Sequence, residues 1–272
     1  MMEPDVSIWR QKVVNDLRER YGPWALVTGS SAGIGKAFSE RLAAEHFNLI
    51  LVARNATRLK EQAGLLERTH GIRCLHLSCD LTRHEDLERL LERTGNVDLG
   101  LFVNNAGASS HHGHFIDRPW SQIEKLVEFN TQVQLRLLHY FACHLARRGR
   151  GGIIQVGSIA GHMSVPYMVE YSASKAFQLA AGEALSYELS ERGVDVLVLS
   201  PGATRSERVD YGMDAADVVN SGLTALGRRP SLVPGWHNRF SSLRFRFLNT
   251  RARALARMGR FQRTRLVQGP AD

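Results

Sequence analysis

The stretch YSASK, residues 171–175, places a phenol and an ammonium four positions apart. On a helix, residues with this spacing share a face and lie about one turn from each other, so Tyr171 and Lys175 can act as a pair. Reduction of a carbonyl requires a proton on oxygen as well as a hydride on carbon. A free tyrosine, with a pKa near ~10, exchanges protons poorly at neutral pH. A nearby ammonium stabilises the phenolate, so we predict that Lys175 lowers the pKa of Tyr171.

A hydroxyl that could assist this pair stands upstream. Ser158 closes an apolar run, thirteen residues before Tyr171. A hydroxyl at the end of a strand can donate a hydrogen bond to a substrate oxygen on which negative charge develops. Tyr171 as acid or base, Lys175 as its tuner and Ser158 as oxygen donor together predict chemistry at a carbonyl or a secondary alcohol.

A glycine-rich segment, TGSSAGIG at residues 28–35, follows the first apolar run and precedes a helical pattern. Glycines at 29, 33 and 35 leave space for a tight turn that approaches a pyrophosphate. The backbone N–H groups and the helix N-terminus supply positive potential there. The segment predicts a dinucleotide site.

The end of the second apolar run bears on the choice of dinucleotide. A carboxylate at this point would bind the ribose hydroxyls of NAD and repel a 2′-phosphate. The chain has Ala53-Arg54 instead, and a guanidinium can bind a phosphate. Arg54 therefore predicts a preference for NADP(H) over NAD(H), with Arg58, one turn later, as a helper.

Short apolar runs alternate with amphipathic stretches over most of the chain. The runs are 24–28, 48–53, 72–78, 99–104, 152–158 and 194–200; the helical patterns lie near 35–46, 55–69, 83–95, 120–148 and 171–192. Runs that are apolar on consecutive positions predict strands buried on both faces. We therefore expect an α/β fold, a Rossmann-like doubly wound parallel sheet of about seven strands with helices on both faces. SLVPG (231–235) predicts the seventh strand.

From Trp24 to about Thr204 the chain resembles the short-chain dehydrogenase/reductase (SDR) family. The motifs that carry the resemblance are, in order, TGSSAGIG, Asp80-Leu81, NNAG (104–107), Asn130, Ser158, YSASK and Pro201-Gly202. It implies that Asn130, Ser158, Tyr171 and Lys175 form a catalytic tetrad. Within it, Lys175 would also hold the nicotinamide ribose, and Asn130 would anchor a water that links Lys175 to solvent.

The resemblance also implies the cofactor contacts and an assembly. The predicted cofactor-binding residues are Gly29, Ser31, Gly33, Ile34, Gly35, Arg54, Asp80, Leu81, Asn105, Ala106, Gly107, Tyr171, Lys175, Pro201, Gly202 and Thr204. Ser206 competes with Thr204 for the contact with the carboxamide. Family members commonly pair the long helices, here 120–148 and 171–192, which implies a homodimer or homotetramer.

Residues near the tetrad suggest the substrate. His162, Met163 and Tyr167 lie between Ser158 and Tyr171, where we expect the substrate-binding wall, and their character favours an apolar molecule. Ordinary packing is the alternative for these residues. HHGH (111–114) lacks a cysteine or carboxylate to complete a metal site, so we expect a substrate-side or solvated loop and no metal.

The charge of the chain is uneven. Eleven arginines and one acid, Asp272, follow residue 227, a balance of +10; with +8 overall, residues 1–227 carry −2. We divide the chain into an N-terminal amphipathic helical extension (1–23), the SDR domain (24–235) and a basic helical C-terminal extension (236–272).

Apolar residues of the C-terminal extension recur at helical spacing: Phe240, Leu243, Phe247, Leu255, Met258 and Phe261. This stripe can pack over the substrate pocket or a partner subunit, or the helix can lie on an anionic membrane surface. Nucleic acid is not expected as a partner, since no recognition motif accompanies the arginines. Three cysteines without metal spacing, no secretory signal and no membrane-length apolar run predict a cytoplasmic protein, with peripheral membrane contact as an option.

The leading hypothesis is an NADP(H)-dependent oxidoreductase that interconverts a carbonyl and a secondary alcohol on an apolar substrate. One alternative is a reductase of activated 3-oxoacyl chains, whose acidic carrier or coenzyme phosphates would meet the basic tail. Another is a dinucleotide-binding sensor or scaffold at a membrane surface. The pairing of Tyr171 with Lys175 favours the first, because a binding module needs no such pair.

Overall fold

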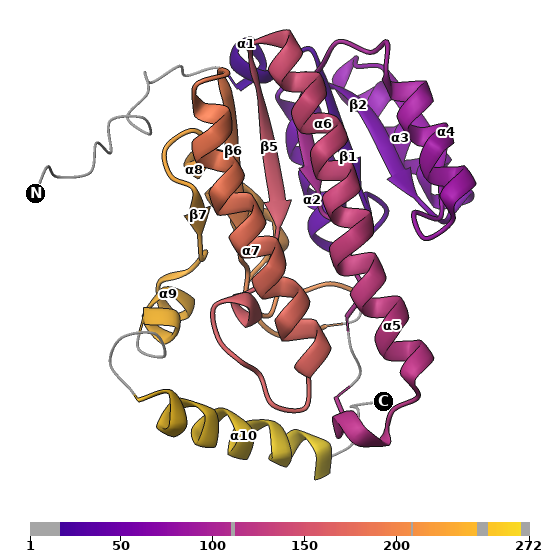
Figure 1. Ribbon diagram of the computed structural model, residues 1–272. Coiled ribbons are helices and arrows are strands. Elements are labelled where there is room, and N and C mark those ends of the chain that lie inside the picture. Colours follow the sequence, from indigo (N-terminus) through magenta and orange to yellow (C-terminus); the bar gives the residue numbers. More distant parts are fainter. Residues whose placement is uncertain (1–16, 110–111, 208, 244–249, 268–272) are drawn as a thin grey trace, which may run out of the picture.

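A computed structural model of the chain describes residues 17–109, 112–207, 209–243 and 250–267 (Figure 1). The helix predicted in the N-terminal extension lies mostly outside these ranges, and its described end is α1 (Leu17–Tyr21). Tyr21 is buried, and both its hydroxyl and the Arg20 guanidinium donate to Asp195 of the sixth strand, at 2.7 and 2.6 Å. This end of the extension is therefore joined to the sheet.

Seven parallel strands form one sheet in the order β3-β2-β1-β4-β5-β6-β7. Their bounds are β1 (Trp24–Thr28), β2 (Asn48–Ala53), β3 (Cys74–Ser78), β4 (Leu99–Asn104), β5 (Gly151–Val156), β6 (Val194–Leu199) and β7 (Ser231–Leu232). The strand order reverses between β1 and β4, which makes their carboxyl ends the switch point where doubly wound sheets bind ligands. The predicted Rossmann-like fold is confirmed.

Helices cover both faces of the sheet (Figure 1). They are α2 (Gly33–Ala44), α3 (Ala56–His70), α4 (His84–Thr94), α5 (Trp120–Glu128), α6 (Gln134–Arg148), α7 (Val169–Ser190) and α8 (Ala215–Ala225). One apolar core joins the sheet to α2, α3 and α8, and a second joins it to α4, α6 and α7. Strand residues such as Leu26 and Val27 alternate between these two cores, which explains why the strands are apolar at consecutive positions.

Two features differ from the sequence prediction. The long pattern at 120–148 is not one regular helix, because a π-helical turn, η3 (Phe129–Val133), joins α5 to α6 and carries Asn130. Helix α8 was not predicted. Its many small residues make the apolar periodicity of a helix hard to recognise in the sequence. Gly222 allows close packing, since a Cβ there would lie 2.8 Å from Leu199 of β6.

The C-terminal segment forms α9 (Trp236–Leu243) and α10 (Arg251–Val267), separated by residues of which 244–249, including Phe247, lie outside the described part. In α9, the apolar residues of this stripe do not pack on the rest of the chain. Trp236, Phe240 and Leu243 are 72%, 56% and 52% exposed. The side of α9 that faces the protein is polar: Ser242 is buried, and Asn238 lies so close to Gly202 that a Cβ there would be 2.8 Å from Oδ1 of Asn238.

Helix α10 does pack on the protein, through only one residue of the predicted stripe, Met258, and two residues outside it. Ala254 and Gln262 are buried and Met258 is half-buried, whereas Leu255 and Phe261 flank this stripe and remain largely exposed. A Cβ at Gly259 would lie 3.7 Å from Pro166, in the segment between Ser158 and Tyr171. Within the described residues, no helix is long and apolar enough to cross a membrane. The boundaries at 23/24 and 235/236 stay a prediction.

Candidate active site

The glycine loop between β1 and α2 has the shape that a pyrophosphate requires. Gly29 and Gly33 adopt φ of +65° and +52°, a region that side chains with a Cβ rarely occupy. A Cβ at Gly35 would overlap the carbonyl oxygen of Gly29. Ala32, at the N-cap of α2, offers no side-chain hydrogen bond, so the first N–H groups of the helix are left for an anion. Ser31 and Ile34 lie in the same turn, partly exposed.

Doubly wound sheets bind ligands in the cleft at their switch point. Here the glycine loop lies on one side of it, and the segment that follows Pro201-Gly202 forms the opposite wall. A Cβ at Gly33 would be 3.7 Å from Cβ of Ser206, which places the glycine loop and this segment face to face. Thr204 donates its hydroxyl proton to the Gly202 carbonyl at 3.2 Å, and Ser206 forms a tight turn with Val209. Both candidates for the carboxamide contact thus lie on this wall.

The adenosine side of the cleft lies at the ends of β2 and β3. Arg54 directly follows β2 and is exposed, and no described residue forms an ion pair with it. Arg58, by contrast, binds Glu207 at 2.9 Å, so its guanidinium is engaged by the opposite wall. Asp80 accepts hydrogen bonds from the backbone and hydroxyl of Thr82, and Leu81 is buried in the core.

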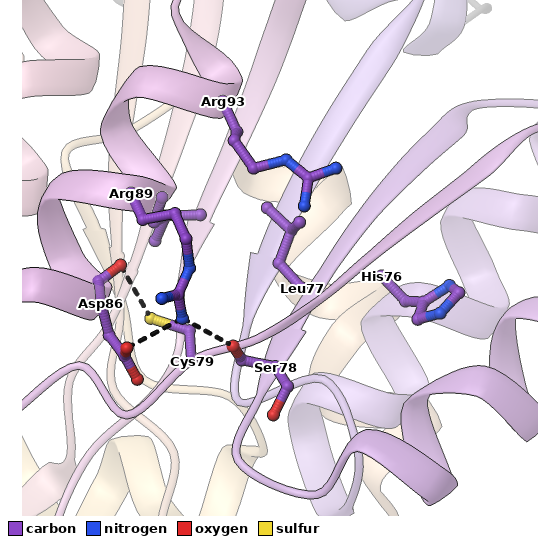
Figure 2. A pocket seen from close by; sticks show the side chains of 8 residues that line it. His76, Leu77, Ser78, Cys79, Asp86, Arg89 and Arg93 are labelled. Atoms are coloured by element: carbon purple, nitrogen blue, oxygen red, sulfur yellow. Dashed lines mark hydrogen bonds and ion pairs between the residues drawn. The ribbon is translucent and has the colours of Figure 1, made fainter.

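A small pocket lies behind β3 at this end of the cleft (Figure 2). Hydrogen bonds of its lining residues stabilise the segment that follows β3. Asp86 accepts a hydrogen bond from the Asp80 backbone at 2.9 Å and pairs with Arg89 at 2.8 Å. The bond from Asp80 is the main reason why the pKa of Asp86 is lowered. The pocket volume of about 70 Å³ is far below the ~300 Å³ at which ligand pockets begin, so we assign it no ligand.

The NNAG segment is joined to β1 across the switch point. The Thr28 hydroxyl accepts hydrogen bonds from the backbone N–H groups of Asn105 and Ala106, at 2.9 and 3.0 Å. The Asn105 amide donates to the Thr28 carbonyl at 2.8 Å. Asn104, fully buried, donates to Gln155 of β5 at 2.8 Å. These bonds hold the carboxyl ends of the three central strands together.

Lys175 is buried at the centre of the candidate site. Its ammonium donates to the Val156 carbonyl at the end of β5 (3.2 Å) and to Oε1 of Gln178 (2.9 Å). A Cβ at Gly107 would lie 3.5 Å from Nζ, so Gly107 leaves the space in which the ammonium sits. Burial lowers the pKa of Lys175 from its ordinary 10.5 to about 8.

Asn130 is fully buried and ties the NNAG segment to α7. Its Oδ1 accepts from the Ala108 backbone and its Nδ2 donates to the Ala108 carbonyl, both at 2.9 Å. The same Nδ2 lies 3.2 Å from the Ser174 hydroxyl. The π-helical turn thereby aligns Asn130 with the face of α7 that carries Tyr171 and Lys175.

Tyr171 and Ser158 lie together, but the pKa of the tyrosine differs from the prediction. Burial raises the pKa of Tyr171, and a hydrogen bond with Ser158 is the opposing influence. The Lys175 ammonium lies 5.8 Å from the centre of the Tyr171 ring and directs its bonds to Val156 and Gln178. The expected lowering by Lys175 is therefore absent from this arrangement, because the ammonium is itself desolvated and bound elsewhere.

The segment that contains Arg118 contacts the start of α7 and the loop before it, close to Tyr171. Arg118 forms a bidentate, largely buried ion pair with Glu170, the residue before Tyr171. Tyr167 has a φ of +68°, accepts a hydrogen bond from the Gly113 backbone and meets the His114 ring edge-on. Tyr167, predicted to bind substrate, thus supports the loop that contains HHGH. Among the described residues no three His, Cys, Asp or Glu gather as a metal site would require; His111 lies outside them.

A cavity of about 760 Å³ lies beside the segment that follows Ser158. His162 and Met163, both predicted substrate residues, line it together with Ala173 and Ala176 of α7 and Leu255 of α10. Helical geometry of 3.6 residues per turn puts Ala173 and Ala176 on the side of α7 away from Tyr171. The cavity therefore adjoins the catalytic helix from its outer side, and α10 forms its far wall.

Some residues of this site could have been identified from sequence and were missed. Gln178 lies three residues after Lys175 and seven after Tyr171, on the same helical face. Thr28 and Ser174 lie inside the TGSSAGIG and YSASK motifs, but nothing in these motifs indicated their roles. The Arg118–Glu170 pair joins residues far apart in the chain, so only the folded structure reveals it.

A doubly wound sheet, a glycine cradle at its switch point and a Tyr–Lys–Ser–Asn cluster beside it define a dinucleotide-dependent oxidoreductase. Sequence comparison makes the family explicit: the short chain dehydrogenase family matches residues 23–214, and the chain belongs to that family. It is 31% identical to a 7beta-hydroxysteroid dehydrogenase of Clostridium sardiniense over 235 residues, 82% of this chain and 90% of the relative.

Solved structures agree with this assignment. A structure from work on 7beta-hydroxysteroid dehydrogenase stereoselectivity superposes with a TM-score of 0.84 at 29% identity, over 90% of this chain and 99% of that one. A short-chain dehydrogenase from Sphingobium yanoikuyae in complex with NADPH gives 0.73 at 31% identity, over 92% and 99%. The protein is an oxidoreductase of the kind that acts on hydroxy and keto groups.

The buried ammonium makes a testable contribution to stability. Because the folded pKa of Lys175 lies below its ordinary value, the unfolded chain binds more protons between pH 8 and 10.5. Lys175 therefore opposes folding fully below pH 8, and this penalty fades as the pH rises toward 10.5. We expect the melting temperature of Lys175→Met, relative to wild type, to fall steadily between pH 8 and 10. Thermal unfolding by circular dichroism measures it. Lys60→Met, at an exposed position of α3, should show no such trend, and a constant difference for Lys175→Met would contradict the assignment.

Proposed function

We propose that the protein is an NADP(H)-dependent oxidoreductase that interconverts a carbonyl and a secondary alcohol on an apolar substrate. The observation that carries the proposal is the cluster of Tyr171, Ser158, Lys175 and Asn130 at the end of β5, beside the glycine cradle. The bound dinucleotide would supply or accept the hydride.

The side chains of the cluster divide the remaining work. Because the pKa of Tyr171 is raised, its phenol keeps its proton at neutral pH and can donate it to a carbonyl oxygen during reduction. Ser158 lies beside that phenol and can donate a second hydrogen bond to the same oxygen. Lys175 would hold the nicotinamide ribose, and the Asn130 side chain joins Ala108, the residue after NNAG, to Ser174 of α7.

The preference for NADP(H) rests on Arg54 and is supported by the NADPH complex of the Sphingobium relative. An exposed guanidinium directly after β2 can bind a 2′-phosphate, and its chain neighbours, Ala53 and Asn55, carry no carboxylate that would repel one. The cradle formed by Gly29, Gly33 and Gly35 fits the pyrophosphate that NAD and NADP share.

An apolar substrate is supported by the relatives named for hydroxysteroids. A reductase of activated 3-oxoacyl chains is the alternative within the same chemistry. Salt separates the two, because phosphates that meet the basic C-terminal segment would make KM rise with ionic strength.

Cofactor choice gives a direct test. We expect NADPH to bind more tightly than NADH, and Arg54→Ala to weaken NADPH about 10-fold or more, since a hydrogen-bonded charge contributes ~1.5–3 kcal/mol. Binding of NADH should be unchanged. Fluorescence titration of both dinucleotides measures these affinities, and Arg68→Ala, at the far end of α3, is the control. Equal affinities in the wild type would overturn the preference.

Catalysis by Tyr171 is tested with Tyr171→Phe. Loss of the phenol proton should lower kcat for NADPH-dependent reduction of apolar ketones by ~10²–10⁴-fold, while NADPH affinity stays within about twofold. Stopped-flow absorbance at the nicotinamide band, with a panel of cyclic and aryl ketones, gives both values. If biological function survives in the variant, the protein is a dinucleotide sensor or scaffold and not an enzyme in its physiological role.

Two surface features support further proposals. Leu135 of α6 and Phe177 and Tyr187 of α7 are 44%, 40% and 60% exposed, which supports pairing of these helices in a homodimer or homotetramer. On α9, Trp236, Phe240 and Leu243 form an outward apolar face, and no acidic residue occurs between Asp217 and Asp272. We propose that this face makes peripheral contact with an anionic membrane.

Vesicle sedimentation tests the membrane contact. The protein should pellet with phosphatidylglycerol-containing vesicles, and less with pure phosphatidylcholine, because each arginine near an anionic surface contributes ~1 kcal/mol. The triple change Trp236→Ser, Phe240→Ser, Leu243→Ser should reduce pelleting at least about 10-fold. Leu65→Ser, at an exposed position of α3, is the control. Equal recovery of the triple variant would exclude α9 as the contact.

A further inference from the structure

Gln178 bridges two members of the catalytic cluster, Lys175 and Asn130. The residue is 2% exposed and lies on α7, one turn after Lys175. Its Oε1 accepts a hydrogen bond from Nζ of Lys175 at 2.9 Å. Its Nε2 donates to the main-chain carbonyl of Asn130, in the π-helical turn, at 2.7 Å. One side chain therefore spans the ammonium and the turn that carries Asn130.

The chemistry of the two partners determines which way the amide points. An ammonium has only donors and a main-chain carbonyl has only acceptors. A rotated amide would place its NH₂ against the Lys175 ammonium and its oxygen against the Asn130 carbonyl, and both contacts would be repulsive. Since Gln178 is buried, water cannot compensate for them. The amide is thus locked with its oxygen toward Lys175.

This arrangement differs from the one that the family resemblance implies, in which a water anchored by Asn130 reaches Lys175. Here the Gln178 amide occupies the contact between Lys175 and the Asn130 carbonyl. The other groups that face the ammonium are the Val156 carbonyl from β5, Gly107 after β4 and the Tyr171 ring. Tyr171 is the titratable one among these, and no described carboxylate reaches Lys175. Gln178 is therefore the side chain best placed to set the charge state of the lysine.

We propose that Gln178 is a positioning residue that holds the Lys175 ammonium beneath Tyr171 and sets the pH at which it loses its proton. The proposal rests on the function proposed above for Tyr171 and Lys175. It goes beyond that function because a residue outside the tetrad sets the position and the protonation state of Lys175. A second consequence is that one of the two acceptor sites of the Asn130 carbonyl is held by an amide, which exchanges no proton near neutral pH.

Three side chains of similar length at position 178 test the proposal: the native glutamine, Gln178→Met and Gln178→Glu. Methionine removes the acceptor and should move the alkaline limb of the kcat–pH profile downward. Glutamate places an opposite charge against the ammonium and should move it upward by about 1 pH unit or more. NADPH-dependent ketone reduction by the holoenzyme between pH 6 and 10.5 gives the profiles. Gln132→Glu adds the same charge at an exposed position of the π-helical turn and should leave the limb in place.

A second readout requires no substrate. The pH dependence of the melting temperature, taken for each variant relative to the same variant carrying Lys175→Met, reports the titration of Lys175, together with that of the new carboxyl in Gln178→Glu. The pH midpoint of this titration should also rise from methionine through glutamine to glutamate at position 178. If it appears while the wild type reduces no ketone, the proposed function fails and the placement of Gln178 stands. Suppose instead that kcat falls equally at every pH and that the pH midpoint of the Lys175 titration is the same in all variants. Gln178 then has only a packing role, and the proposal is overturned.

Discussion

Burial of one ammonium constrains everything around it. Lys175 has lost its hydration, so each acceptor that it contacts must come from the fold: the Val156 carbonyl at the end of β5 and the Gln178 amide on its own helix. Gln178 in turn requires the Asn130 carbonyl, and the Asn130 side chain requires the backbone of Ala108. A strand end, a π-helical turn, a loop and a helix are thereby held in one register by the cost of leaving a buried charge unpaired.

The same region shows how a parallel sheet builds a site from separate segments. Reversal of the strand order at β1 and β4 opens a crevice at their carboxyl ends, and the Thr28 hydroxyl closes its base by accepting from Asn105 and Ala106. The glycine loop occupies one side and the segment after Gly202 the other, near enough that Gly33 and Ser206 face each other. The Arg58–Glu207 pair joins the two sides beyond the crevice.

The C-terminal helices use their amphipathic character in opposite ways. Helix α10 turns Ala254 and Gln262 to the protein and forms a wall of the cavity beside His162. Helix α9 turns Asn238 inward, against Gly202, and leaves its aromatic side outside. Family membership alone would not predict this difference, because function and partners reside in such appended segments more than in the shared sheet.

The sequence by itself determined the sheet and the glycine loop, because local periodicity and short motifs encode them: the predicted bounds of β1, β2 and β4 match those observed. Asn130 of the candidate tetrad followed only from the family resemblance. The sequence also places Gln178 on the helical face of Tyr171. Only the tertiary structure decided the pKa directions of Tyr171 and Lys175, the Arg118–Glu170 pair and the exposed face of α9. Desolvation, long-range ion pairs and the side that a helix turns inward depend on which segments meet in space, and no pattern along the chain records that.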